Sequence, residues 1–89
     1  MEKSLHSNEY MTFVSVLRQV RQDLGVTQEG LAMTLEATQT FVSKCERGER
    51  RLDVIELRQW CAALGIELED FAKQLNRALE KSKQRVLLK

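Results

Sequence analysis

Apolar side chains recur every three or four residues along most of this chain, which is the spacing of one face of an α-helix. The first such stretch covers about 9–24, and four apolar residues would share its inner face: Phe13, Leu17, Val20 and Leu24. A glycine follows three of the periodic stretches, at the place where a left-handed residue commonly ends a helix: Gly25, Gly48 and Gly65. The pattern predicts five helices and no strand.

The second and third helices are expected to lie very close together in the chain. Thr27 is the expected N-cap of a helix over about 28–35, and Thr38 begins another that ends near Arg47. Only residues 36–37 separate the two. A helix, a very short turn and a second helix form the helix-turn-helix arrangement.

The fourth helix has the clearest start. Asp53 is the expected cap, with Glu56 three residues later as in a capping box, and Leu52 with Leu57 would form a hydrophobic staple. Its inward residues are expected to be Leu57, Trp60, Cys61 and Leu64. A fifth helix begins near Leu68, and its apolar residues fall at helical spacing: Leu68, Phe71, Ala72, Leu75 and Leu79.

Composition supports one all-α unit. The chain has 89 residues, enough for a single domain, and it contains no proline. We expect a compact five-helix domain over 9–79, between a flexible leader at 1–8 and a basic C-terminal tail at 80–89. No apolar run approaches the length of a membrane span, and the start lacks the blocks of a signal peptide. The expected location is therefore the cytoplasm, with no membrane partner.

Charge is distributed unevenly although the net charge is only +1. Residues 1–72 hold 8 basic and 12 acidic side chains, whereas residues 73–89 hold 6 basic and 1 acidic. A smaller basic cluster lies in mid-chain and consists of Lys44, Arg47, Arg50 and Arg51. Local basic patches matter more than the total for a nucleic-acid partner.

Residues for catalysis or metal binding are scarce. Cys45 and Cys61 stand sixteen residues apart in apolar settings, without the neighbours of a zinc site, and are expected to be reduced core residues. His6 is the single histidine, and no glycine-rich phosphate loop follows a strand. We therefore expect no metal, no cofactor and no enzymatic activity. Without a separate ligand domain, no small-molecule effector is expected either.

Three segments resemble a known family in the right order and at the right separations: 24–32, 41–53 and 63–65. The resemblance is to the lambda-repressor and Cro-like helix-turn-helix domains, often called Xre-type regulators, and it covers roughly 14–75. It implies a compact five-helix fold of the lambda-repressor type and sequence-specific binding of double-stranded DNA. It also implies that the third helix lies in the major groove.

The resemblance assigns two groups of DNA-contacting residues. The polar outer face of the third helix would read bases, and it consists of Thr38, Gln39, Thr40, Ser43, Lys44 and Arg47. The start of the second helix and the loop after the third would hold the DNA backbone, through Thr27, Gln28, Arg50 and Arg51. Plain solvation is the alternative interpretation for the third-helix face and for Arg50 and Arg51. For Thr27 the alternative is that it only caps the second helix, and both can be true.

Four other residues carry structural expectations. Arg21 and Glu46 match an ion pair that aligns the recognition helix, with a structural role and no direct part in specificity. Glu36 stands where the family usually has glycine, so a residue with a Cβ would adopt an awkward backbone conformation. Phe41 is expected to pack against the second helix instead of stacking on a base.

Regulators of this kind are usually symmetric dimers on palindromic operators. We expect a homodimer held by apolar residues of the C-terminal region, namely Leu75, Leu79, Val86, Leu87 and Leu88. A solvated tail is the alternative. The predicted function is a DNA-binding transcriptional regulator, a repressor or autoregulator. The alternative is a protein-interaction module, such as an antitoxin that also binds its own promoter.

Overall fold

The computed structural model describes residues 8–87, and these form five α-helices without any strand. The helices are α1 (Asn8–Asp23), α2 (Gln28–Leu35), α3 (Gln39–Glu46), α4 (Val54–Leu64) and α5 (Leu68–Leu87). The predicted all-α class is therefore confirmed. The expected domain ended at residue 79, whereas α5 continues without a break to Leu87.

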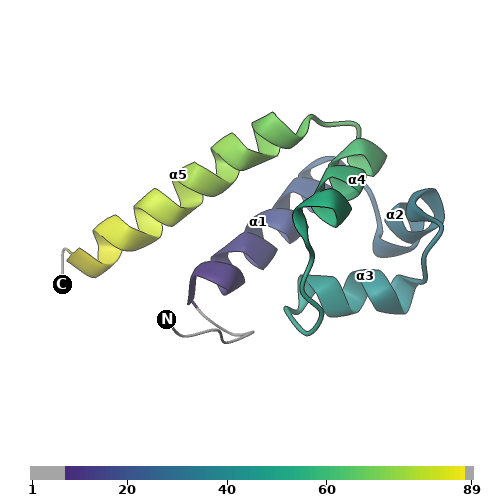
Figure 1. The fold of residues 1–89 in the computed structure, drawn as a ribbon, viewed down its shortest axis with the longest axis horizontal. Coiled ribbons are helices and arrows are strands. Elements are labelled where there is room, and N and C mark those ends of the chain that lie inside the picture. The colour runs from purple at the N-terminus through teal and green to yellow at the C-terminus, as the bar shows by residue number, and fades with distance from the viewer. Residues whose placement is uncertain (1–7, 88–89) are drawn as a thin grey trace.

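The helices are arranged around α1 and α4 (Figure 1). The long α5 packs along one side of α1, and α3 contacts α1 on the other side. The short helix α2 lies against both α3 and α4. The pair α2–α3 therefore sits at the opposite end of the molecule from the C-terminal half of α5 (Figure 1).

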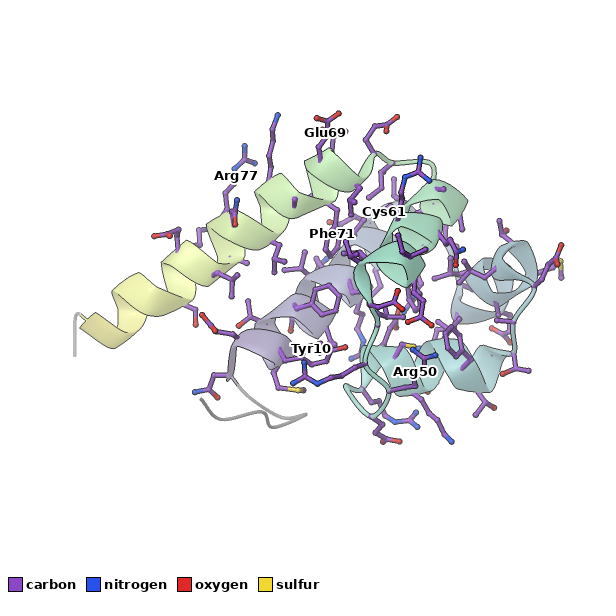
Figure 2. The ribbon with its side chains drawn as sticks, in the orientation of Figure 1. Tyr10, Arg50, Cys61, Glu69, Phe71 and Arg77 are labelled. Carbon is purple, nitrogen blue, oxygen red and sulfur yellow. The ribbon has the colours of Figure 1, made fainter. Side chains whose placement is uncertain are left out.

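All of the helices that hold α3 in place contribute to one hydrophobic core. Its fully buried residues are Leu17, Leu31, Val42, Cys45, Trp60, Cys61 and Phe71. Figure 2 shows Phe71 of α5 and Cys61 of α4 directed into the interior, whereas Glu69 and Arg77 point away from it. Phe71 also meets Phe13 of α1 edge to face, with ring centroids 5.8 Å apart. Such aromatic pairs contribute about 0.5–1.5 kcal/mol beyond their buried area.

Two of the expected inward positions are wrong. Leu24 is 48% exposed, because α1 ends at Asp23 and the left-handed Gly25 turns the chain away from the α1 face. Ala72 is exposed on α5, because the buried side of that helix is centred on Phe71 and Leu75. The other predicted inward residues of α1, α4 and α5 are buried or half-buried.

The predicted helix starts are confirmed by their hydrogen bonds. The Thr27 hydroxyl accepts from the Gly30 N–H at 3.0 Å, and Thr38 caps α3 in the same way. At α4 the capping box is complete: Asp53 Oδ1 accepts from the Glu56 N–H, and Glu56 Oε1 accepts from the Asp53 N–H. Caps of this kind each contribute about 1 kcal/mol.

Both cysteines are reduced and buried within the core, as expected. Burial raises the pKa of the Cys45 thiol from 9.0 to about 11, against a smaller opposing effect of Arg50. Burial also raises the pKa of Cys61.

Among the described helices, none combines the length and the apolar character that crossing a bilayer requires.

Candidate nucleic-acid interface

The turn between α2 and α3 is tight although it contains no glycine. Glu36 adopts the left-handed conformation, with φ 57° and ψ 42°, as its position predicted. Its N–H donates to the Met33 carbonyl at 3.1 Å, and the Ala37 N–H donates to the Ala32 carbonyl at 2.9 Å. These bonds satisfy the last carbonyls of α2. The strain at Glu36 is therefore accommodated without loosening the turn.

The outer face of α3 is open to solvent. Val42 and Cys45 are fully buried beneath it and fix its rotation. The predicted base-reading side chains are exposed, apart from a half-buried Ser43: Thr38, Gln39, Thr40, Lys44 and Arg47. The structure therefore brings all six onto one exposed polar surface, which we call the α3 face.

A buried ion pair joins the end of α3 to α1. Arg21 donates from Nε to Glu46 Oε2 at 2.6 Å and from Nη2 to Glu46 Oε1 at 2.9 Å. The Glu46 side chain is 0% exposed and that of Arg21 only 9%. Arg21 Nη1 also donates to the Val26 carbonyl at 2.8 Å, so one guanidinium ties α1, α3 and the loop before α2 together. The pair expected from the sequence is present.

A chain of hydrogen bonds leads from this ion pair to the α3 face. Gln28 Nε2 donates to Glu46 Oε1 at 3.0 Å, and Gln39 Nε2 donates to Gln28 Oε1 at 2.7 Å. Gln28 was expected on the DNA backbone and Gln39 on the bases, and their mutual contact was not predicted. Gln28 and Gln39 are the first residues of two adjacent helices, but their contact depends on the crossing angle of those helices, which the sequence pattern does not give.

The arginines after α3 have partners inside the protein. Arg47 pairs with Glu49 at 2.8 Å and also donates to the Ser43 hydroxyl. Arg50 pairs with Glu56 at 2.8 Å. The hydrogen bond from Arg50 lowers the pKa of the Glu56 carboxyl, and the Asp53 N–H adds to this effect. Contact with DNA at these side chains would have to compete with the carboxylates.

Two arginines of this loop also lie over aromatic rings. The Arg50 guanidinium is 5.3 Å from the centre of the Phe41 ring, and that of Arg51 is 4.2 Å from the centre of the Tyr10 ring. Figure 2 shows Arg50 and Tyr10 where this loop passes α1 and α3. These contacts were not predicted, since nothing in the spacing of Tyr10 and Arg51 indicates that they meet. The loop is thereby fastened to the helices on both sides.

The helix-turn-helix family model matches residues 17–71, a span that includes the ion pair, the turn and the α3 face. The chain belongs to this family. A 38% identical XRE-family like protein from Pseudomonas syringae pv. tomato DC3000 has the same fold. The match covers 81% of this chain and 88% of that chain, with a TM-score of 0.74. No protein with a curated description matches.

Two regulators of known structure are also similar to this helix-turn-helix protein. The restriction-modification controller protein C.Esp1396I is 26% identical with a TM-score of 0.79, over 85% of this chain and 99% of that one. The clp gene regulator ClgR from Corynebacterium glutamicum is 26% identical with a TM-score of 0.74, over 99% and 90%. DNA-binding transcription regulation is the function class that these similarities give.

Phe41 packs inward against the core, but the ring that it meets belongs to α4, whereas a contact with the second helix was expected. Its ring centroid lies 6.4 Å from that of Trp60. A small cavity of about 150 Å³ beside these rings is also lined by Leu35 of α2. Phe41 therefore anchors α3 from below and leaves the α3 face polar.

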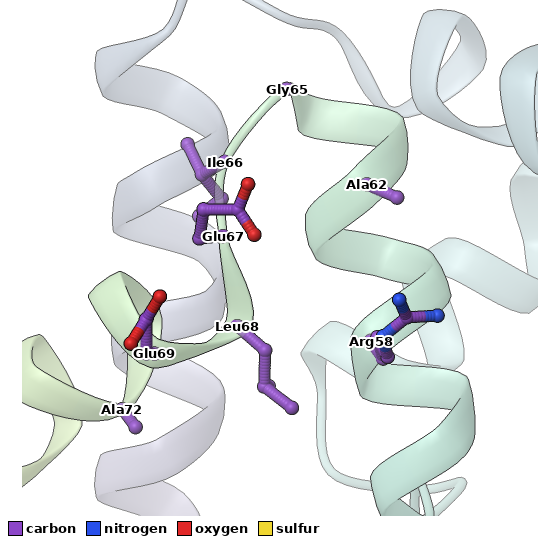
Figure 3. Close-up of a pocket in the computed structure, with 8 residues that line it drawn as sticks. All are labelled: Arg58, Ala62, Gly65, Ile66, Glu67, Leu68, Glu69 and Ala72. Carbon is purple, nitrogen blue, oxygen red and sulfur yellow. The ribbon is translucent and has the colours of Figure 1, made fainter.

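A larger open cavity of about 820 Å³ lies between α4 and the start of α5 (Figure 3). Eight residues line it: Arg58, Ala62, Gly65, Ile66, Glu67, Leu68, Glu69 and Ala72. It contains none of the predicted DNA-contacting residues.

Within the described part of the chain, no group of carboxylates, cysteines and histidines could hold a metal ion.

The predicted dimer residues differ in their surroundings. Leu75 is half-buried and packs against the core, so it is less available to a partner than expected. Leu79 is half-buried on α5. Val86 and Leu87 belong to the last turn of α5, and Leu88 lies outside the described residues. Larger apolar exposure occurs instead at the start of α4, where Val54 and Ile55 are each 62% exposed.

Proposed function

We propose that this protein is a sequence-specific DNA-binding repressor or autoregulator that reads the major groove with the α3 face. The observation that carries the proposal is the exposed polar face of α3, which is held rigid from below by the buried Arg21–Glu46 pair. A solvated helix does not require a buried bidentate ion pair to fix its direction. Base readout requires that the side chains bonding to base edges are held in a fixed position, because a misplaced hydrogen bond is lost.

The chemistry of the α3 face suits base edges. Gln39 has a donor and an acceptor that match the N7 and N6 positions of adenine, and the methyl group of Thr40 can contact a thymine methyl. Lys44 and Arg47 can donate to the O6 and N7 atoms of guanine. Arg47 would first have to leave Glu49, to which it is bonded in the free protein.

The DNA backbone would meet the start of α2. The N-terminus of a helix carries free N–H groups and partial positive charge, which suit a phosphate. Thr27 satisfies only the Gly30 N–H, so other N–H groups of this first turn remain for an anion. Arg50 and Arg51 are proposed to contact phosphates at the edge of the site, from the loop that they also fasten.

The protein is proposed to act in the cytoplasm as a homodimer on a palindromic operator. The similar protein C.Esp1396I is described as a tetramer in complex with its natural 35 base-pair operator, which supports assembly of copies on DNA. We keep the C-terminal part of α5 as one candidate contact, and the exposed Val54 and Ile55 provide a second. Two-fold symmetry would place the recognition helices roughly 34–36 Å apart, one DNA turn.

The test is a titration of the DNA upstream of the gene, compared with a shuffled duplex of equal length and composition. Binding should be tighter to the upstream DNA and should weaken steeply with salt, because neutralised phosphates release counterions. Equal affinity for both duplexes would contradict sequence-specific regulation. Sedimentation of the same samples tests the dimer: a monomer with and without DNA would contradict that part alone.

A further inference from the structure

We infer that Glu46 is a positioning residue for base specificity: through the amide of Gln28, its buried carboxylate sets which atoms Gln39 presents to the DNA. The inference rests on the proposed function, since it requires that Gln39 reads a base. It also extends the role of the Arg21–Glu46 pair, which the sequence analysis interpreted as structural alone.

The first step is the fixed polarity of Glu46. Its carboxylate is fully buried and receives two hydrogen bonds from Arg21, a side chain that stays protonated in proteins. An ionised carboxylate has acceptors and no donor. Any further group that bonds to Glu46 must therefore donate a hydrogen.

The second step is the orientation of Gln28. Its side-chain amide could face Glu46 with either end, and only the Nε2 end can donate to the carboxylate, at the observed 3.0 Å. The reversed amide would place the carbonyl Oε1 against carboxylate oxygens, losing a charge-assisted hydrogen bond and adding repulsion. Glu46 thus directs Gln28 Oε1 toward the start of α3.

The third step is the edge that Gln39 presents. Gln28 Oε1 accepts one amide hydrogen of Gln39 at 2.7 Å, which leaves Gln39 with one amide hydrogen and its carbonyl oxygen. One donor beside one acceptor is the pattern that complements adenine in the major groove. A reversed Gln28 would instead donate to the Gln39 oxygen, leaving two donors outward, a pattern that suits the two acceptors of guanine.

The experiment uses the full chain and an operator in which each position is replaced in turn. Gln39→Ala identifies the base pair that Gln39 reads. At that pair, the ratio of affinities for adenine and guanine is measured for the wild type, Glu46→Gln and Gln28→Met. The ratio should exceed roughly tenfold in the wild type, the scale of one bidentate contact, and fall several-fold in both variants. Affinity of Glu46→Gln for a shuffled duplex should change much less. Gln28→Met also removes a predicted backbone contact, so its affinity should fall on every duplex and only the ratio of affinities is compared.

A second variant and a control variant separate the inference from a general loss of stability. Gln28→Met removes the hydrogen bonds to Glu46 and Gln39 at a half-buried site and leaves the Arg21–Glu46 pair intact. Its result can therefore be interpreted even if Glu46→Gln unfolds. Arg18→Gln is the matched control, because Arg18 lies 3.7 Å from the same carboxylate but outside the hydrogen-bond chain, and the ratio should persist. A folded Gln28→Met protein with the wild-type ratio would overturn the inference alone. A wild type that discriminates at no base pair would overturn the proposed function as well.

Discussion

Arg21 of α1 and Glu46 of α3 lie 25 residues apart in the sequence and meet in the interior through two hydrogen bonds, of 2.6 and 2.9 Å. Because the Glu46 side chain is fully buried and that of Arg21 nearly so, each charge depends mainly on the other for its compensation. The pair thereby fixes the angle between α1 and the end of α3. It also supplies the fixed charge from which the hydrogen bonds to Gln28 and Gln39 extend.

The ion pair predicts strong energetic coupling. Arg21→Met or Glu46→Gln alone should reduce the free energy of unfolding by about 3–5 kcal/mol, because each leaves a buried partner uncompensated. The double variant should lose clearly less than the sum of the two. Denaturant unfolding of the four proteins provides the cycle. Additive losses would show that the two side chains are not coupled in solution.

The α3 face and the loop after it predict two different kinds of binding defect. Gln39→Ala and Lys44→Ala should each cost ~1–3 kcal/mol on the preferred site and relax its specificity, because they remove base contacts. Arg51→Ala should weaken binding to all sequences nearly equally and reduce the salt dependence. Competition between specific and shuffled duplexes separates the two. Equal losses on both duplexes for Gln39→Ala and Lys44→Ala would remove these residues from the set of base readers.

The left-handed Glu36 predicts a stabilising substitution. Glu36→Gly should raise the free energy of unfolding by roughly 1 kcal/mol, because a residue with a Cβ is strained at φ 57° and glycine is not. Met33→Gly, at an exposed position inside α2, is the matched control and should lower it by about 1 kcal/mol. A loss of stability in Glu36→Gly would mean that the turn is not strained.

The buried cysteines are expected to have thiols with raised pKa values and low reactivity. Cys45 and Cys61 should resist alkylation in the native protein at pH 8 and react once it is unfolded, because the thiolate is disfavoured in the core. The folded-state pKa of Cys45 lies above its ordinary value, so the stability that this proton adds is present below pH 9.0. It is lost as the pH rises toward about 11. Rapid labelling of both thiols in the folded protein would contradict their burial.

Much of the fold could be predicted from the sequence because local signals agreed with one another. Caps at Thr27, Thr38 and Asp53 place the starts of three helices, and the side chain of each makes the predicted hydrogen bond. The apolar period then selects the buried faces. It failed at Leu24 because a helical period says nothing about where the helix stops within a turn. The length of α5 was missed because its polar C-terminal half was interpreted as a tail.

The candidate site was predicted as a set of residues but not as a network. Helix periodicity places Gln39 and Lys44 outside and Val42 inside, and family resemblance pairs Arg21 with Glu46. The bonds from Gln28 to both Glu46 and Gln39 depend on the crossing angle of α2 and α3, which no local pattern gives. The same holds for Arg51 over Tyr10, a contact between a loop and α1.

If the protein holds DNA through α3, a matched pair of lysine variants should differ in their affinity for DNA. Lys44→Ala lies on the α3 face, whereas Lys73→Ala removes the same charge from an exposed site on α5, outside the α3 face. Affinity for the upstream DNA is measured by fluorescence anisotropy at one moderate salt concentration. The account predicts a loss of ~1–3 kcal/mol for Lys44→Ala and little change for Lys73→Ala. Equal losses, or a larger loss for Lys73→Ala, would contradict it.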